Sequence, residues 1–300
     1  MIIGNNNITN FLEKSLDADK ITHAYIFNGP KSIGKRTTAE WFISKLLKTE
    51  KIHTHPDFLE VKAETDIIKK EDIDKVIEKA RLSSFIGGYK VILVHNAHQM
   101  NMASANAFLK TLEEPTKKTV IILLTSEIGS MLPTIISRSS VINFKPIANN
   151  LIVDFLKKEH GEDNALVYAK LSHGRLGIAV KIAKQGLNKS EELQEFYKLF
   201  FGEERYRIKL AKAILKDKTK NKEVLKEKVD LWLEFLRDIF FIKYGLIDNV
   251  THTYALDATK KISEQRSAQN FANIGKRLLK MKSLLKNNIN PSLMLENLII

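Results

Sequence analysis

The first half of the chain alternates short apolar runs with segments whose apolar residues recur every three or four positions. The apolar runs are residues 24–28, 57–61, 90–95 and 119–125. The segments with the spacing of a helix that buries one face are residues 37–48, 69–83 and 104–113. Buried strands that alternate with helices are typical of a parallel sheet covered on both faces. The pattern therefore predicts an α/β domain over residues 1–147.

The second half has helical spacing throughout and no apolar run of comparable strength. Three short helices are predicted after Pro146, at residues 151–158, 164–171 and 176–183. Longer helices are predicted at residues 190–200, 205–216, 224–244, 256–285 and 291–298. We therefore expect a small helical domain at 148–188 and a separate all-helical domain at 189–300. A chain of 300 residues usually forms two or three domains rather than one.

Composition excludes several classes of protein. The hydrophobic fraction of 44% and charged fraction of 28% are typical of a globular protein, and no stretch approaches the roughly 18 apolar residues of a membrane span. We expect a cytoplasmic protein with no membrane partner. The absence of cysteine excludes disulfides and cysteine-ligated zinc. The net charge of +13 fits a nucleic-acid or acidic partner and equally a lysine-rich composition with no such partner.

A phosphate-binding loop follows the first predicted strand. Residues 29–35 read Gly-Pro-Lys-Ser-Ile-Gly-Lys, which matches the glycines and the lysine of a P-loop at their usual spacing. Gly29 and Gly34 let backbone N–H groups approach phosphate oxygens, and the start of the next helix adds a favourable dipole. We expect Lys35 to reach the outer phosphates of a nucleotide.

The residues that would hold magnesium at this loop are missing. Ser or Thr normally follows the lysine, but here it is Arg36, whose guanidinium cannot ligate a cation. Thr37 carries a hydroxyl one position late, about 100° further round the helix. The third predicted strand ends in His95 and Asn96 in place of acidic residues. We therefore do not expect metal-assisted hydrolysis. His95 and His98 have no further metal ligand beside them, so loop histidines are the simpler interpretation.

Five segments of the chain resemble the bacterial AAA+ subunits of DNA polymerase III clamp loaders. Residues 23–30 (HAYIFNGP) and 55–58 (HPDF) resemble their opening segments. Residues 103–115 are similar to the family's NALLKTLEEP helix, and residues 132–139 (LPTIISRS) to its LPTILSRC segment. Residues 288–298 resemble the closing helix of the delta-prime branch. These motifs occur in the family's order and span nearly the whole chain.

The resemblance implies a three-part architecture: a RecA-like P-loop domain at 1–147, a three-helix lid at 148–188 and a helical collar at 189–300 that packs with like domains in a ring. Arg36 and His95 resemble the delta-prime branch rather than the ATP-hydrolysing gamma/tau branch. The gamma/tau branch also carries a nucleotide-sensing arginine in the lid, where this chain has Gly177.

The function implied by the resemblance is that of a non-hydrolysing stator, which helps to place a sliding clamp on primed DNA. Expected partners are the gamma/tau and delta subunits, the sliding clamp and primer–template DNA. No cofactor is expected to be required, and ATP binding is expected to be weak or absent. No zinc is expected either, because the family's four-cysteine insert is missing. Arg138 is expected to act in trans as an arginine finger on a neighbour's ATP; capping its own helix or pairing with a carboxylate is the competing interpretation.

Two pairs of residues on the predicted helix 104–113 have more than one interpretation. Asn106 and Lys110 are four residues apart and share a helix face, which is either solvated or a link between the nucleotide site and DNA. Glu113 and Glu114 precede Pro115, and a helix end explains them more simply than acid–base catalysis.

Two other functions remain open on the sequence alone. The first is an active ATPase motor of the gamma/tau type, in which Thr37 and an unseen carboxylate hold magnesium. The second is a basic protein that binds DNA by itself with a steep salt dependence.

Overall fold

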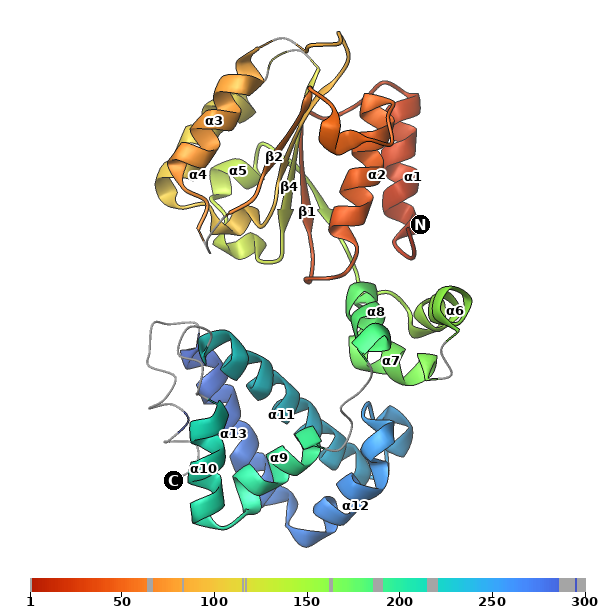
Figure 1. Ribbon diagram of the computed structural model, residues 1–300, viewed down its shortest axis with the longest axis vertical. Coiled ribbons are helices and arrows are strands. Elements are labelled where there is room, and N and C mark those ends of the chain that lie inside the picture. Colours follow the sequence, from red (N-terminus) through yellow and green to blue (C-terminus); the bar gives the residue numbers. More distant parts are fainter. Residues whose placement is uncertain are drawn as a thin grey trace. The chain divides into compact units, whose positions relative to one another are not determined.

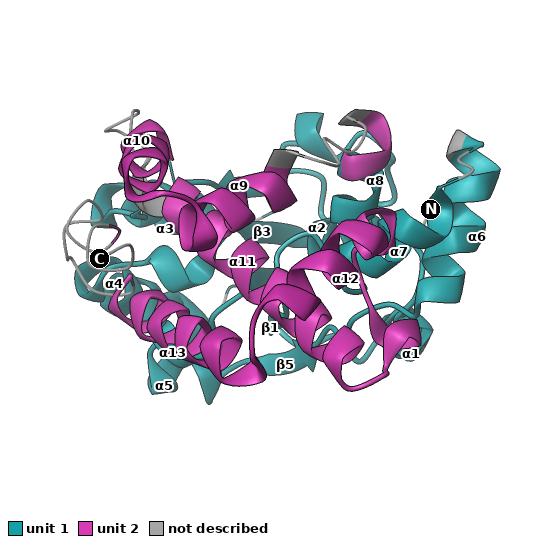
Figure 2. Ribbon diagram, turned by 90° about the horizontal axis from the view of Figure 1, so that it is seen from below, with its two compact units in different colours: residues 1–181 teal, residues 182–300 magenta. Residues whose placement is uncertain are grey.

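The computed structural model describes residues 2–63, 67–82, 84–114, 116, 118–161, 164–185, 191–214, 221–285 and 295. The chain forms two compact units, residues 1–181 and 182–300 (Figure 2). This division groups the lid helices with the sheet, so the expected boundaries at 147 and 188 stay a prediction. No helix in the described part is long and apolar enough to cross a membrane.

Unit 1 is built on a five-stranded parallel sheet (Figure 1). Its strands are β1 (Ala24–Asn28), β2 (Phe58–Val61), β3 (Lys90–Val94), β4 (Thr119–Thr125) and β5 (Ser140–Asn143). They lie in the order β2-β3-β4-β1-β5, and every neighbouring pair is parallel. The predicted parallel sheet is therefore confirmed. Strand β5 was not predicted because only Val141 and Ile142 of its four residues are apolar, which is too weak a signal without the partner strand β1.

Helices cover both faces of this sheet (Figure 1). One face carries α1 (Asn6–Asp17) and α2 (Lys35–Leu47); the other carries α3 (Lys70–Arg81), α4 (Met102–Glu113) and α5 (Pro133–Ile136). Successive strand residues point to opposite faces, so in β1 Tyr25 and Phe27 pack towards α1 and α2, whereas Ala24 and Ile26 pack towards the other helices. Burial on both sides explains why the strands are apolar at nearly every position.

The lid consists of α6 (Asn149–His160), α7 (Ala165–Ser172) and α8 (Leu176–Gln185). Its connection to the sheet is tight: the Ile147 N–H donates to the Gly174 carbonyl at 2.9 Å. Gly174 has a φ of +76°, and a Cβ there would lie 2.6 Å from the Pro146 side chain. Only glycine fits this turn, which fixes the start of α8.

All the secondary structure in the described residues of unit 2 is helical. Its helices are α9 (Glu191–Phe201), α10 (Glu204–Ile214), α11 (Asn221–Lys243), α12 (Leu256–Gln265) and α13 (Ala268–Leu284). The helix α11 buries Trp232 and Phe235 completely, and both belong to the core of this unit. The single helix predicted at 256–285 is wrong: the chain breaks at Arg266, and the Ser267 side chain accepts a hydrogen bond from the Asn270 N–H to begin α13. The helix predicted at 291–298 lies, except for Leu295, outside the described residues.

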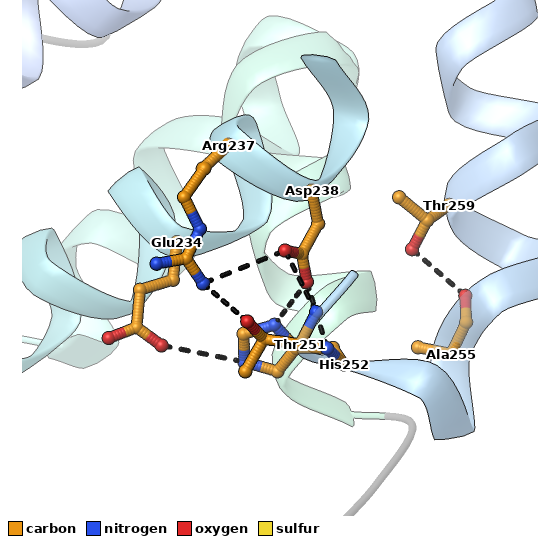
Figure 3. Close-up of polar contacts among 7 residues, drawn as sticks. All are labelled: Glu234, Arg237, Asp238, Thr251, His252, Ala255 and Thr259. Atoms are coloured by element: carbon orange, nitrogen blue, oxygen red, sulfur yellow. Dashed lines mark hydrogen bonds and ion pairs between the residues drawn. The ribbon is translucent and has the colours of Figure 1, made fainter. Parts of the chain in front are cut away.

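A buried aspartate–histidine pair ties the segment after α11 back to that helix (Figure 3). Asp238 and His252 are both fully buried, with Asp238 Oδ2 2.7 Å from His252 Nδ1. The Asp238 carboxylate also accepts the backbone N–H groups of Thr251 and His252 at 3.1 and 2.8 Å. One carboxylate thereby satisfies a turn that would otherwise bury unpaired N–H groups.

Candidate nucleotide site and domain-edge arginine

The phosphate-binding loop connects β1 to α2 at the carboxyl end of the sheet, where open α/β sheets bind their ligands. Its first glycine is sterically required, because a Cβ at Gly29 would lie 2.8 Å from the Phe144 carbonyl oxygen. Gly34 has a φ of +105°, which L side chains rarely adopt. The predicted P-loop geometry is therefore present in the backbone.

Lys35 is turned onto its own loop. Its ammonium donates to the carbonyl oxygens of Gly29 at 2.5 Å and Pro30 at 2.7 Å. Burial, with a smaller contribution from the neighbouring Lys31, lowers the pKa of Lys35 to about 8. The lysine braces the loop in this structure, and an incoming phosphate would have to exchange for those two carbonyls.

The loop opens into a pocket of about 430 Å³, within the range of small-ligand sites. Four basic side chains line it, Lys31, Lys35, Arg36 and His95, and among the described lining residues there is no carboxylate. The lid closes one side through Gly177. The pocket is shaped and charged for an anion, but it offers no acidic ligand for a divalent cation.

Arg36 occupies the position of the missing magnesium ligand. Its Nε lies 2.7 Å from Glu40 Oε1, one helical turn along α2. Thr37 lines the same pocket. Arg36 lines the pocket too, and its fixed positive charge would repel a metal ion there.

The end of β3 carries a histidine–glutamate pair. His95 Nε2 lies 2.7 Å from Glu60 Oε1, and Lys62 Nζ lies 2.9 Å from Glu60 Oε2. Burial lowers the pKa of His95 although Glu60 opposes the shift. Burial raises the pKa of Glu60, but hydrogen bonds from Lys62 and His95 outweigh it and leave the value lowered. The residues of this site therefore do not fit a magnesium–nucleotide complex.

Sequence analysis missed Glu60, which lies on β2. Its only signal was a charged residue within an apolar strand. The parallel pairing of β2 with β3 brings it beside the end of β3.

The lid rests directly on the phosphate loop. The Gly177 N–H donates to the Ser32 carbonyl at 2.9 Å, and a Cβ at position 177 would approach Ser32 to 3.1 Å. Gly177, which stands in place of a nucleotide-sensing arginine, thus forms a backbone contact between the lid and the phosphate loop.

His98 has a different environment from His95. Its Nδ1 lies 3.1 Å from Thr125 Oγ1, which also accepts the Glu127 N–H. No cluster of three potential metal ligands occurs among the residues that the structure describes. The hydrogen bond agrees with a structural role for this loop histidine.

Arg138 lies in the short segment between the end of α5 and β5, which is an edge strand of the sheet. Its Nη1 donates to the Thr134 carbonyl at 3.1 Å, and its Nη2 lies 2.7 Å from Glu113 Oε1. Both contacts of the competing interpretation, helix capping and carboxylate pairing, are therefore present. The role in trans stays a prediction.

Asn106 and Lys110 are exposed on α4. Neither lines the pocket of the phosphate loop. Lys110 instead lines a separate hollow of about 520 Å³ with Glu113 and Glu114. The structure therefore does not bring these residues to the nucleotide site, and a coupling role stays a prediction.

Comparisons with known proteins agree along the length of the chain. Residues 4–148 match the family model described as DNA polymerase III, delta subunit, and residues 188–300 match DNA polymerase III, delta subunit, C terminal. The DNA polymerase III subunit delta' of Bacillus subtilis is 25% identical over 98% of this chain and 94% of its own length. The corresponding subunit of Haemophilus influenzae is 29% identical over 81% of this chain and 74% of its own length.

Solved structures with a similar fold include a related DNA polymerase III protein. A gamma subunit-related protein of DNA polymerase III from Thermotoga maritima superimposes with a TM-score of 0.53 at 20% identity, covering 96% of this chain and 97% of that one. Thermotoga maritima RuvB follows with a TM-score of 0.50 at 17% identity, covering 85% and 88%. The two family models and the full-length relatives, with the AAA+ fold beneath them, show that the chain belongs to the delta-prime family of DNA polymerase III clamp-loader subunits.

Proposed function

We propose that this chain is a non-hydrolysing stator of a clamp loader, which helps to load the sliding clamp on primed DNA. Its partners would be the gamma/tau and delta subunits, the clamp and primer–template DNA within the complex. It would require no cofactor, and its own ATP binding would be weak or absent. Family membership supports the replication role, and the site supports the loss of hydrolysis.

One observation carries the proposal: the two positions that would supply oxygen ligands to magnesium hold a guanidinium and an imidazole instead. Arg36 is paired with Glu40, and His95 is paired with Glu60. Phosphoryl transfer needs a cation to neutralise charge on the transferring group. Without such a ligand set, the loop can retain its shape and still lack turnover.

The proposed contribution to a neighbour is Arg138. It lies outside the chain's own nucleotide pocket, at the edge of the domain, with 38% of its side chain exposed. A guanidinium is permanently charged and forks onto phosphate oxygens, which suits the charge that develops in phosphoryl transfer. A subunit with no hydrolysis of its own can thereby complete the site of the adjacent one.

The motor alternative retains two supporting observations. Thr37 lines the pocket beside Lys35, and Glu60 lies next to His95. This alternative requires Glu60 to leave both His95 and Lys62, which makes it the weaker proposal.

Two substitutions in the reconstituted complex test both halves of the stator proposal. Lys35→Ala in this chain should leave DNA-stimulated ATPase and clamp loading unchanged, because this site does not turn over. Arg138→Ala should reduce both while the ring still assembles. An arginine finger raises the rate of hydrolysis at its own site by about 10³-fold or more. The loss of activity measured for the whole complex should be smaller, because the other sites in the ring still hydrolyse ATP.

Two results would contradict the proposal. Turnover by the isolated chain at about 1–100 s⁻¹, abolished by Lys35→Ala, would establish the motor instead. Unchanged clamp loading by an intact Arg138→Ala ring would remove the finger role.

A further inference from the structure

The Arg138 guanidinium has two polar partners, one on its own helix and one on α4. Nη1 donates to the Thr134 carbonyl at 3.1 Å, and Nη2 lies 2.7 Å from Glu113 Oε1. A guanidinium carries five N–H donors in a rigid fork. These two contacts therefore leave donors for a third group while they restrict where the fork points.

Glu113 is poorly placed for helix stability. It is the last residue of α4, and Glu114 follows it directly. A negative charge at a helix C-terminus opposes the helix dipole, so two carboxylates there do not serve the helix.

Because Glu113 and Arg138 are exposed, their ion pair does not contribute much to the free energy of folding. The side chains of Glu113 and Arg138 are 47% and 38% exposed, and exposed ion pairs contribute little to stability. What such a contact does is limit the rotamers of a long arginine side chain. Fixing the side chain in advance reduces the entropy lost when it binds a ligand.

We propose that Glu113 is a positioning residue for Arg138. Its carboxylate holds the guanidinium in one orientation at the domain edge, so that the free donors of the fork meet the terminal phosphate of the nucleotide on the adjacent subunit. Phosphate then shares or replaces the carboxylate as the acceptor. This inference rests on the proposed role of Arg138 in trans.

The test is the DNA-stimulated ATPase of the reconstituted complex, with kcat and KM measured separately. Glu113→Ala should lower kcat by about three- to tenfold, since misplacing a group that contacts the transition state lowers the rate, and KM should stay constant. Glu113→Gln should fall between the wild type and Glu113→Ala, because its amide oxygen still accepts a hydrogen bond. Glu114→Ala is the matched control: it removes the neighbouring carboxylate, which has no contact with Arg138, and should behave as the wild type.

A double substitution separates positioning from a general structural effect. Glu113→Ala in an Arg138→Ala background should cause no additional loss, because residues that act through one interaction are non-additive. In the isolated chain, side-chain NMR relaxation should show a more mobile Arg138 Nε–H in Glu113→Ala than in the wild type. Unchanged thermal unfolding of the variants would confirm that they fold.

Three outcomes would overturn the proposal. The first is an equal loss from Glu113→Ala with and without Arg138. The second is a rise in kcat, which would mean that the carboxylate competes with phosphate for the arginine. The third is that Glu113→Ala has no effect although Arg138→Ala impairs the complex. That result would contradict the positioning role of Glu113 and leave the stator proposal intact. If Arg138→Ala itself has no effect, the finger role fails first and the positioning role fails with it.

Discussion

Position 36 shows how one side chain changes the chemistry of a site while leaving its backbone intact. The glycines at 29 and 34 still shape the loop, and Lys35 still reaches back across it. Arg36 puts a charge in place of a hydroxyl, and Glu40 holds that charge along α2. At the end of β3, His95 and Lys62 both contact the Glu60 carboxylate. The carboxylates of Glu40 and Glu60 are therefore held by side chains of this chain rather than free for a metal ion.

The buried Asp238–His252 pair predicts a large stability effect in unit 2. Asp238→Ala should lower the free energy of unfolding by about 3–5 kcal/mol, because it leaves the His252 ring and two buried backbone N–H groups without their acceptor. Trp232 is fully buried in this unit, so its fluorescence during urea unfolding, in a Trp41→Phe background, reports the change. Asp257→Ala, on an exposed position of α12, is the control and should cost less than about 1 kcal/mol. If Asp238→Ala also lowered the free energy of unfolding by less than about 1 kcal/mol, the prediction would be contradicted.

The same pair predicts a pH dependence. Burial raises the pKa of Asp238, but hydrogen bonds from His252 and Thr251 outweigh it and leave the value lowered. A carboxyl with a lowered pKa stabilises the fold fully above its unfolded value of about 3.9, and this stabilisation is lost as the pH falls through the folded value. The difference between wild type and Asp238→Ala should therefore shrink below about pH 4.

At the scale of elements, the lid helix α8 is held on the phosphate loop by backbone atoms. Gly177 permits this approach because it has no side chain, and its N–H reaches the Ser32 carbonyl at 2.9 Å. Any side chain at 177 has to push Ser32 aside, since a Cβ would already lie 3.1 Å from it.

Gly177→Arg should therefore separate α8 from the loop. Loss of the hydrogen bond should speed exchange of the position-177 amide by about fivefold, as expected for a bond worth about 1 kcal/mol. ATPase activity should not appear, because the magnesium ligands are still absent. Lys181→Ala on the same helix is the control, because it is exposed and does not line the pocket. Unchanged exchange at position 177 would mean that the loop yields to the side chain instead.

At the scale of the whole molecule, the two units have separate cores. The core of unit 2 is formed by its own helices, and unit 1 has one apolar core on each face of the sheet. Each unit therefore has the burial needed to fold by itself.

Deletion of residues 189–300 tests the role expected for the second unit. The fragment 1–188 keeps α8 whole and should unfold cooperatively, as followed by circular dichroism. It should no longer co-purify with the gamma/tau and delta subunits, because the helices proposed to form the collar are gone. A fragment that joins the complex with full-length affinity would show that assembly does not depend on them.

The local pattern of residues was sufficient to predict much of the fold. The spacing of apolar residues and glycines over short stretches predicts four strands, most helices and the phosphate loop. Helix α1 was missed because its asparagines are weak helix formers; it is held by Ile8 and Leu12, which are buried against the sheet domain. The break at Arg266 was missed because no proline or glycine marks it; residues 263–267 are polar, and a single serine, Ser267, caps the helix that follows.

The sequence by itself therefore determined the parallel sheet, the P-loop, the loss of its magnesium ligands and the family. All of these depend on residue type and on spacing along the chain. Only the tertiary structure decided which charges meet: Glu60 with His95, Glu113 with Arg138 and Asp238 with His252. Those pairs join residues from different elements, and their contacts depend on strand order, helix packing and the path of the connecting segments. Periodicity reports which face of an element is buried, but it carries no information about which neighbour that element will have.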